Sequence, residues 1–197
     1  MSDYTSWENL PLNRICGIDE AGRGPLAGPV TAAAVILPQD FPLGILGDSK
    51  KLTSLQRLKA VREILIHAAA CGLGWAWPEE IDELNIHFAT LIAMERAYGE
   101  IRKSCDLILV DGKFTPAIPG TVKAVIKGDS QVPAIMAASI LAKTARDRWM
   151  ERYSWIEGRY LFEKHKGYPT REHAERCARY GLSVIHRRSF HVPEFQK

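Results

Sequence analysis

The sequence has no apolar run long enough to cross a membrane and no pattern of a secreted protein. Its longest apolar stretches, residues 30–37 and 134–142, are far shorter than the ~20 residues that a membrane-spanning helix needs. The polar first 14 residues do not have the basic and then apolar pattern of a signal peptide. We therefore expect a soluble, cytoplasmic protein with no membrane partner.

Cysteine is also scarce, and nothing in the sequence divides the chain. The four cysteines lie far apart and form no C-x-x-C pair, which argues against a disulfide framework and against a zinc knuckle. We expect them to pack as small apolar side chains. With no repeat or linker and with 46% hydrophobic residues, the 197 residues predict one domain over 1–197, with a core of about residues 14–190.

The formal net charge is only +3, but the charge is unevenly distributed along the chain. Residues 1–142 hold 13 Lys and Arg against 16 Asp and Glu, whereas residues 143–197 hold 13 against 7. A basic last third is typical of a protein with a polyanionic partner, although a solvated helical face has the same composition.

Apolar stretches of strand length alternate with long amphipathic segments. Strands are expected at 14–19, 30–37, 72–77, 107–110 and 121–126. Helices are expected at about 53–70, with Thr53 as the cap and Leu55, Leu58, Val61, Ile64 and Leu65 on one face, at 81–102 in one or two pieces, from a cap at Asp129 or Ser130 to about 153, and at 170–180. This order predicts an α/β fold with a mixed central sheet flanked by helices.

Four acidic residues lie at the ends of the expected core strands. Asp19 and Glu20 come directly after the apolar residues 15–18 of the first strand, Asp111 comes directly after the fourth, and Asp129 follows the fifth. Carboxylates at strand ends lie at the edge of the sheet, where open α/β sheets place their sites. Converging carboxylates repel one another, and Mg²⁺ or Mn²⁺ would relieve that repulsion. Taken singly, each acid is better explained by a turn, a helix cap or a solvated loop, and only the placement of all four at strand ends favours a shared site.

The loop between the first two expected strands is rich in glycine. Residues 22–27, GRGPLA, match the G-x-G-x-x-A pattern of dinucleotide-binding proteins. That pattern requires a following helix, whereas here Pro25, Gly28 and Pro29 lead into an expected strand, so a nucleotide-cofactor enzyme is disfavoured. Glycines leave backbone N–H groups open to a ligand, and a tight connection between strands would also need them.

Seven motifs resemble those of the ribonuclease HII family and occur in the family's order. The first, DEAGRGPLAGPV at 19–30, is long enough to be specific by itself. The others are DSKKL at 48–52, DG at 111–112, KGDS at 127–130, AASILAK at 137–143, HKGYPT at 165–170 and HRRSF at 186–190. The resemblance covers nearly the whole chain, from residue 17 to residue 190.

The resemblance implies a ribonuclease H-like fold and a two-metal nuclease that uses Mn²⁺ or Mg²⁺. The family's metal-binding catalytic carboxylates fall on Asp19, Glu20, Asp111 and Asp129. Such an enzyme hydrolyses the RNA strand of RNA/DNA hybrids and cuts 5′ to single ribonucleotides in duplex DNA. Its products carry 5′-phosphate and 3′-hydroxyl ends.

Substrate contacts are likewise implied by the resemblance. The family senses the ribose 2′-hydroxyl with the backbone of Gly22, Arg23 and Gly24 and with a tyrosine that falls on Tyr168. That tyrosine packs on the next deoxyribose, so an RNA-to-DNA junction is expected. Phosphate contacts are implied for Ser139 and Lys143 and expected for Lys50 and Lys51, and helical spacing adds Arg146 to the face of Ser139 and Lys143. The histidines are expected to be structural or to lie on the surface.

Other interpretations remain open at this point. The acid at 129 is aspartate rather than glutamate, and there is no additional N-terminal domain, which argues against the sister family, ribonuclease HIII. A nucleic-acid-binding relative that no longer cuts is disfavoured by the four acids. Longer relatives carry an additional helical tail that grips the duplex, and this chain ends soon after the last motif. A monomer is expected, and a sliding-clamp contact is compatible with the resemblance although no residue here marks it.

Overall fold

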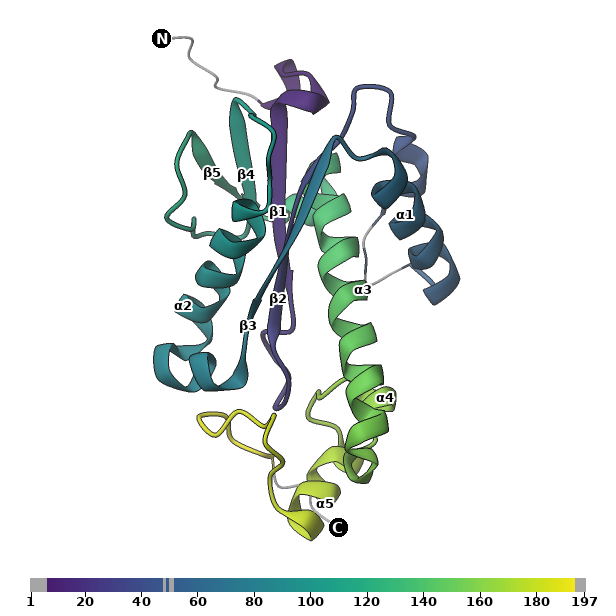
Figure 1. Cartoon of the computed structure of the whole chain (residues 1–197), viewed down its shortest axis with the longest axis vertical. Helices are drawn as coiled ribbons and strands as arrows, with labels where there is room; N and C mark the ends of the chain where they lie inside the picture. The colour runs from purple at the N-terminus through teal and green to yellow at the C-terminus, as the bar shows by residue number, and fades with distance from the viewer. Residues whose placement is uncertain (1–6, 48, 50–51, 194–197) are drawn as a thin grey trace.

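A computed structural model of the chain describes residues 7–47, 49 and 52–193. Its five strands form one sheet with helices on both faces (Figure 1). The strands are β1 (Ile15–Ala21), β2 (Val30–Ile36), β3 (Ala70–Ala76), β4 (Leu107–Asp111) and β5 (Val122–Val125). The helices are α1 (Ser54–His67), α2 (Pro78–Gly99), α3 (Pro133–Ile156), α4 (Phe162–His165) and α5 (Arg171–Tyr180). Within the described residues, no helix is both long and apolar enough to span a bilayer.

The sheet is mixed, with the strand order β3-β2-β1-β4-β5. β2 pairs antiparallel with both β1 and β3, while β1 runs parallel to β4 and β4 runs parallel to β5. The carboxyl ends of β1, β4 and β5 therefore lie at the same edge of the sheet. This arrangement confirms the predicted α/β fold with a mixed sheet.

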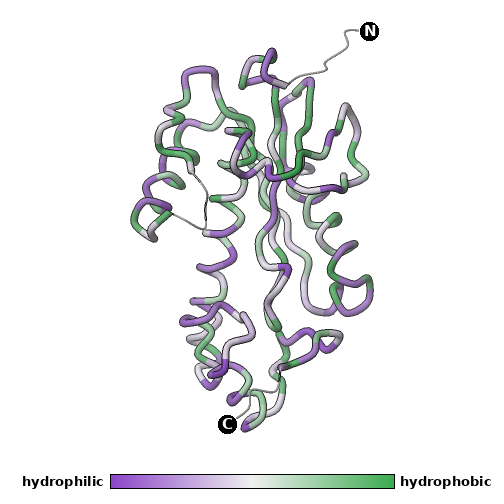
Figure 2. The backbone as a smooth tube through the Cα atoms, turned by 180° about the vertical axis from the view of Figure 1, so that it is seen from behind, coloured by the Kyte–Doolittle hydropathy of each residue, from purple (hydrophilic) through white to green (hydrophobic). Residues whose placement is uncertain are grey.

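β2 is buried along its whole length because both faces of the sheet are covered. Ala32 and Ala34 pack in the core beneath α2, whereas Ala33 and Val35 pack in the core beneath α1 and α3. A strand that faces two cores needs apolar side chains at every position, which explains its unbroken apolar run. The hydropathy-coloured backbone shows green segments among the central strands and purple turns on the outer helices (Figure 2).

α1 begins at the predicted residue, but only part of the predicted apolar face is buried. Thr53 accepts a hydrogen bond from the Gln56 backbone, and the Gln56 side chain bonds back to Thr53, which makes a complete capping box. The buried residues of α1 are Ala60, Val61 and Ile64. The other three residues of the predicted face, Leu55, Leu58 and Leu65, are exposed.

The predicted cap of the long helix is wrong. Residues Gly128–Ser130 form a separate turn of 3₁₀ helix, η4, and α3 begins only after Val132, with Pro133 in its first turn. Asp129 therefore belongs to a turn beside the end of β5 and is not part of α3. The residue at the cap position of α3 is Val132, which makes no side-chain cap bond.

The last part of the chain packs below the sheet, at the lower end of the molecule in Figure 1. A separate apolar cluster holds it there, built from Ala27 of the glycine-rich loop, Met150 of α3, Phe162 of α4 and Cys177 of α5 among others. Thr170 caps α5, and the helix ends at Gly181, whose φ is +75°. The glycine-rich loop thereby packs against α3 and the C-terminal segment.

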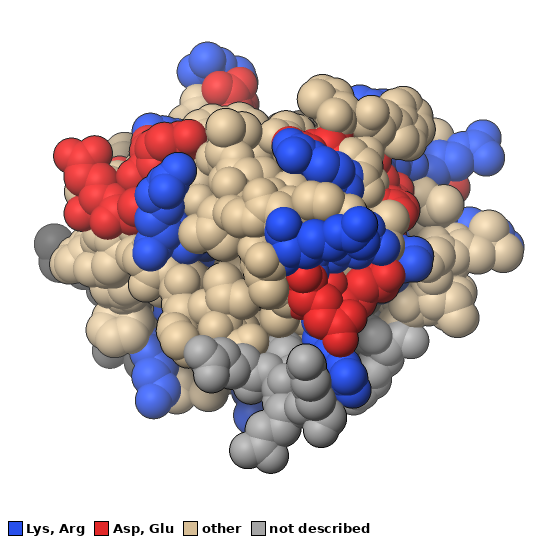
Figure 3. Space-filling model, turned by 90° about the horizontal axis from the view of Figure 1, so that it is seen from below, with Lys and Arg blue, Asp and Glu red and all other residues tan. Residues whose placement is uncertain are grey.

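The basic excess of the last third does not form a continuous basic surface on the lower face. Seen from below, Lys and Arg side chains alternate with Asp and Glu (Figure 3). Ion pairs neutralise many of them, including Arg159 with Glu157 and Lys164 with Glu172. Two further arginines of this third are buried and make no surface charge at all.

Candidate active site

Three of the predicted acids meet where β1 and β4 end side by side. The two strands are parallel, and Ile18 of β1 pairs with Val110 of β4. The next residues along these strands are Asp19 and Asp111, and Glu20 follows Asp19. Register and strand direction therefore bring the carboxylates to one edge of the sheet, as the sequence predicts.

Asp129 joins this edge through η4. The Asp129 backbone N–H donates a hydrogen bond to Asp111 Oδ1 at 3.3 Å. Gly128 makes this approach feasible, since a Cβ at that position would overlap the Ile135 side chain and stand 3.5 Å from Asp111 Oδ1. Asp129 thus adjoins Asp111, and the four predicted acids come from three separate segments of the chain.

Asp19 and Glu20 are poorly solvated and are repelled by neighbouring carboxylates. The side chain of Asp19 is only 5% exposed, and burial raises its pKa well above the ordinary value, with repulsion from Glu20 and Asp111 adding to the effect. A hydrogen bond from Ser139 opposes this rise. Burial also raises the pKa of Glu20, and the Arg23 guanidinium, 3.5 Å from Glu20 Oε1, acts in the opposite direction.

The donor set suits a hard divalent cation. Carboxylate oxygens are the preferred protein ligands of Mg²⁺ and Mn²⁺. Buried carboxylates that raise each other's pKa are unstable as neighbours unless protons or cations neutralise them. Asp19, Glu20, Asp111 and Asp129 are therefore the residues that would hold the metal.

Asp19, Glu20 and Asp111 share a cavity of about 280 Å³ with most of the predicted substrate contacts, and Asp129 is not among its lining residues. Tyr168 is 40% exposed and lies opposite Gly24, where an added Cβ would stand 3.8 Å from the tyrosine ring. The residues that line the cavity are Asp19, Glu20, Ala21, Gly22, Arg23, Gly24, Ser49, Asp111, Ser139, Lys143 and Tyr168. Predicted residues from separate segments of the sequence are thus brought together, while Lys50 and Lys51 lie outside the described residues.

A larger cavity of about 450 Å³ lies elsewhere, between α1, β3 and α3. Its lining is mostly aliphatic, with Val61, Leu65 and Leu141 among its residues, and Glu100 is its sole carboxylate among the described residues. A cavity with one acid lacks the several carboxylates that a divalent cation prefers, whereas the smaller cavity combines three of them with open backbone donors. The smaller cavity is therefore the candidate active site.

Ser139 and Lys143 line the cavity from α3 but are already engaged with protein groups. Ser139 is buried, lies 2.9 Å from the Ser49 hydroxyl and also bonds to Asp19. Lys143 Nζ bonds to both oxygens of Asp147, at 2.7 and 2.8 Å. Ser139 thus supports the carboxylate cluster, and Lys143 is presented at the cavity by an ion pair on its own helix.

The glycine-rich loop runs into β2 and is not followed by a helix, as the sequence predicts. Gly22 and Gly28 have φ of +95° and +84°, the left-handed region that only glycine adopts without strain. Arg146, which the sequence placed among the phosphate contacts, is 1% exposed and lies beneath this loop. That expectation is wrong because the face of α3 that bears Arg146 is covered by the loop and the C-terminal segment.

A buried cluster of histidines supports Tyr168 from below. The Ser183 N–H donates to His186 Nδ1, so His186 carries its proton on Nε2 and donates it to His173 Nε2, 3.0 Å away. His173 Nδ1–H in turn donates to the Tyr168 carbonyl at 3.0 Å. Cys177 Sγ lies 3.2 Å from His186 Nε2.

This cluster is also a set of soft metal donors. Among the described residues it is the one group of at least three such side chains whose donor atoms all lie within 4.8 Å of one another. The hydrogen bond from Ser183 places the His186 proton on the nitrogen that faces the cluster, so that nitrogen has no free lone pair for a metal. The cluster is explained as a hydrogen-bond relay that fixes the backbone of Tyr168.

Acid is expected to destabilise the protein through this relay. Burial lowers the pKa of both His173 and His186 to about 4. An unfolded chain binds these protons near pH 6.5, so their stabilisation is complete above that pH and is lost as the pH falls towards 4. We expect the Tm of His173→Gln to fall less between pH 7 and pH 4.5 than the Tm of the wild type. In the wild type, the buried histidines lose on the order of 3 kcal/mol of stabilising free energy over this range.

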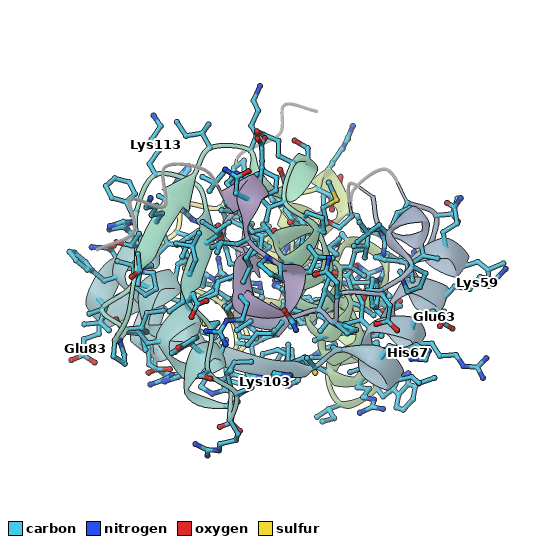
Figure 4. The ribbon with its side chains drawn as sticks, turned by 90° about the horizontal axis from the view of Figure 1, so that it is seen from above. Lys59, Glu63, His67, Glu83, Lys103 and Lys113 are labelled. Carbon is cyan, nitrogen blue, oxygen red and sulfur yellow. The ribbon has the colours of Figure 1, made fainter. Side chains whose placement is uncertain are left out.

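The matched control for this experiment is His67→Gln on α1. His67 lies at the surface beside Glu63, 3.3 Å from it, and Figure 4 shows both at the periphery of the molecule. This variant should keep the pH dependence of the wild-type Tm. Equal acid-induced losses in the wild type and in His173→Gln would show that the buried relay is not the source.

Comparisons with known proteins agree with this geometry. A family model described as Ribonuclease HII matches residues 16–195. The Ribonuclease HII of Treponema denticola is 53% identical over 194 residues, which cover 90% of this chain and 98% of that protein. The crystal structure of the ribonuclease H2 from Pyrococcus horikoshii OT3 has a TM-score of 0.73 at 26% identity, covering 90% of this chain and 94% of that one. The RNase HII solved in a PCNA complex from Archaeoglobus fulgidus has a TM-score of 0.74 at 26% identity, covering 93% and 98%.

Proposed function

Since this chain belongs to the ribonuclease HII family and is therefore a ribonuclease H, we propose that it is a divalent-metal-dependent endonuclease that recognises ribonucleotides within duplex DNA. It cuts on the 5′ side of a single embedded ribonucleotide, as well as within the RNA strand of RNA/DNA hybrids, and leaves 5′-phosphate and 3′-hydroxyl ends. The observation that carries this proposal is the meeting of Asp19, Glu20 and Asp111 with the Gly22–Gly24 backbone and Tyr168 in one cavity.

The four carboxylates are the metal-binding part of the proposed site. Asp19, Glu20, Asp111 and Asp129 would hold Mg²⁺ or Mn²⁺ ions, which in a two-metal site supply the charge that activates a water molecule and stabilises the leaving 3′-oxygen. Ser139 keeps Asp19 oriented through its hydrogen bond. The intact set of acids also disfavours a relative that binds nucleic acid without cutting, since uncompensated carboxylates would repel phosphate.

Recognition of the ribose is assigned to the other side of the cavity. The 2′-hydroxyl is the group that distinguishes RNA from DNA, and it both donates and accepts hydrogen bonds. Backbone groups of Gly22, Arg23 and Gly24 and the Tyr168 hydroxyl are the polar groups that face each other there. The tyrosine ring provides a flat apolar surface for the neighbouring deoxyribose.

We also propose a protein partner, because a relative of this chain was solved with one. The Archaeoglobus fulgidus enzyme was solved with PCNA, and a sliding-clamp contact is proposed here by analogy with that structure. A monomeric, cytoplasmic enzyme is the remaining part of the proposal. The most direct test of the activity concerns the substrate itself.

The test uses an end-labelled DNA duplex with one ribonucleotide, an all-DNA duplex of the same sequence and an RNA/DNA hybrid. We expect cutting at the 5′ side of the single ribonucleotide with Mg²⁺ or Mn²⁺, none with chelator, and none of the all-DNA duplex. Tyr168→Phe removes only the hydroxyl and should lower kcat/KM on the single-ribonucleotide duplex by about 10-fold, the value of one buried hydrogen bond.

Tyr180→Phe is the matched control, since Tyr180 does not line the cavity. It should retain wild-type kcat/KM on every substrate. Cutting of the hybrid without cutting at the single ribonucleotide would instead favour a ribonuclease HIII-like activity. Binding without cutting in either metal would replace the enzyme by a nucleic-acid-binding relative.

A further inference from the structure

Two arginines are fully buried beside the active-site cavity. Arg146 of α3 and Arg187 of the C-terminal segment are each 1% exposed. Neither forms an ion pair with a carboxylate among the residues that the structure describes. A buried guanidinium without a counter-ion is costly, and burial lowers the pKa of Arg146 to about 10 and that of Arg187 to about 9, so both stay charged at neutral pH. Such a cost points to a specific role.

Arg187 determines which way the peptide groups of the glycine-rich loop point. Its guanidinium donates to the carbonyls of Gly22 at 2.6 Å, Arg23 at 2.9 Å and Gly28 at 3.0 Å. In a trans peptide the carbonyl of one residue and the N–H of the next point in opposite directions, and the described chain has no cis peptide. With the carbonyls of Gly22 and Arg23 turned inward, the N–H groups of Arg23 and Gly24 point outward.

These two N–H groups are available to a ligand. Arg23 and Gly24 line the 280 Å³ cavity. Within residues 7–47, 49 and 52–193, neither backbone N–H donates a hydrogen bond to another backbone group in a loop or turn. Two adjacent backbone donors held open in this way are a preformed site for a single oxygen atom.

Arg146 joins the loop to the segment that carries the tyrosine. It donates to the carbonyls of Pro29 at 2.9 Å, Ala27 at 3.0 Å and Lys166 at 3.0 Å. Its guanidinium carbon also lies 5.9 Å from the centre of the Tyr168 ring. One rigid side chain thus contacts both sides of the cavity, and a planar guanidinium with five N–H donors is suited to fix their separation.

We propose that Arg146 and Arg187 are positioning residues that set the enzyme's discrimination between ribose and deoxyribose. Arg187 turns the Arg23 and Gly24 N–H groups toward the sugar, and Arg146 fixes their distance from Tyr168. Neither arginine touches the substrate. Gly22 is required for this arrangement, because a Cβ at that position would overlap the Arg146 side chain. This inference rests on the proposed function and assigns the specificity of that same site.

The test compares Arg146→Lys and Arg187→Lys with the wild type. Lysine keeps the charge, but its single ammonium group does not reproduce the planar fork that spans three carbonyls. The readout is the inhibition constant of the all-DNA duplex, used as a competitor, divided by KM for the single-ribonucleotide duplex. Neither constant depends on the fraction of active enzyme, so partial unfolding alone does not change their ratio.

We expect each Lys variant to lower this ratio by about 10-fold, the size expected for losing one or two hydrogen bonds to the ribose. Arg148→Lys is the matched control, because Arg148 is an exposed neighbour on the same helix, and it should keep the wild-type ratio. Wild-type ratios in both Lys variants would overturn the inference while leaving the proposed function intact. A wild type that does not cut the single-ribonucleotide duplex would instead overturn the proposed function.

A second measurement needs no variant, and it tests the inference even if the Lys variants do not fold. In the wild type at neutral pH, the arginine Nε–H groups can be followed by ¹⁵N NMR during hydrogen exchange. Arg146 and Arg187 should exchange at least ~10-fold more slowly than Arg148, since their Nε–H groups bond to buried carbonyls. Exchange as fast as that of Arg148 would show that these Nε–H groups do not form the hydrogen bonds to the loop carbonyls that the inference requires.

Discussion

Replacing Asp19 by asparagine is expected to abolish cleavage and, at the same time, to stabilise the metal-free protein. Asp19 is the most deeply buried of the described site carboxylates, and burial together with repulsion from Glu20 and Asp111 raises its pKa. Asparagine removes the buried charge but keeps an oxygen that accepts the Glu20 N–H, now bonded to Asp19 Oδ1 at 2.7 Å. Metal binding should be lost, with a fall in kcat of roughly 10³-fold or more.

The gain in stability is measured as Tm in chelator. We expect a rise of a few degrees, at ~2–4 °C per kcal/mol of relieved repulsion for a chain of this size. A carboxyl whose pKa is raised on folding costs stability at neutral pH, and this cost decreases as the pH falls below the raised value and is gone below the ordinary pKa. The difference in Tm between Asp19→Asn and the wild type should therefore shrink on acidification.

Asp106→Asn is the control for this pair of effects. Asp106 is a partly exposed acid that pairs with Arg14 near the surface, away from the cavity. This variant should keep full activity and should not gain Tm in chelator. If Asp19→Asn retains activity, or if it lowers the metal-free Tm, the carboxylate cluster is not the strained, metal-requiring site described above.

Replacing Gly17 by alanine is expected to cause the largest loss of stability. Gly17 lies in β1 where α3 crosses the sheet, and an added Cβ would fall well inside van der Waals contact with the backbone of Ala134 and Ile135. Backbone atoms cannot rotate away as a flexible side chain would, so α3 must shift. We expect a loss of about 3 kcal/mol, which lowers Tm by roughly 6–12 °C, measured by thermal unfolding.

Activity should fall as well, because α3 carries Ser139, whose hydrogen bond orients Asp19. Gly99→Ala is the matched control, since Gly99 ends α2 and an added Cβ would meet nothing within 4 Å. Alanine favours helix there, so Tm should stay the same or rise slightly. A Gly17→Ala protein with wild-type Tm would show that β1 and α3 are not packed as closely as described.

The position of the acids could be predicted from the sequence because strand ends are visible in it. Asp19 and Asp111 each follow an apolar run of strand length, and the sheet then brings them together through parallel pairing. The local sequence does not determine the pairing of β1 with β4, because this pairing depends on the order of the strands in the sheet. The resemblance to the ribonuclease HII family implies that these acids belong to one site, and the structure brings Asp19 and Asp111 together.

The two buried arginines could not be predicted from local patterns. A cation at helical spacing from Ser139 and Lys143 has the sequence pattern of an exposed phosphate contact, and this interpretation of Arg146 proved wrong. Its burial arises from segments far away in the sequence, the loop near residue 27 and the segment near residue 187. The cap assigned to Asp129 failed for a related reason, since a 3₁₀ turn and Pro133 separate it from α3.

Calorimetric titration of Mn²⁺ is the most direct test of the proposal that the four carboxylates form one divalent-cation site. The titration is made at pH 6 in two buffers of different ionisation enthalpy, so that released protons are counted. Because burial raises the pKa of Asp19 and Glu20, Mn²⁺ binding to the wild type should release protons, and Asp111→Asn should bind Mn²⁺ at least ~10-fold more weakly. Equal Mn²⁺ affinity in the wild type and in Asp111→Asn, or no binding in a protein that cleaves, would contradict it.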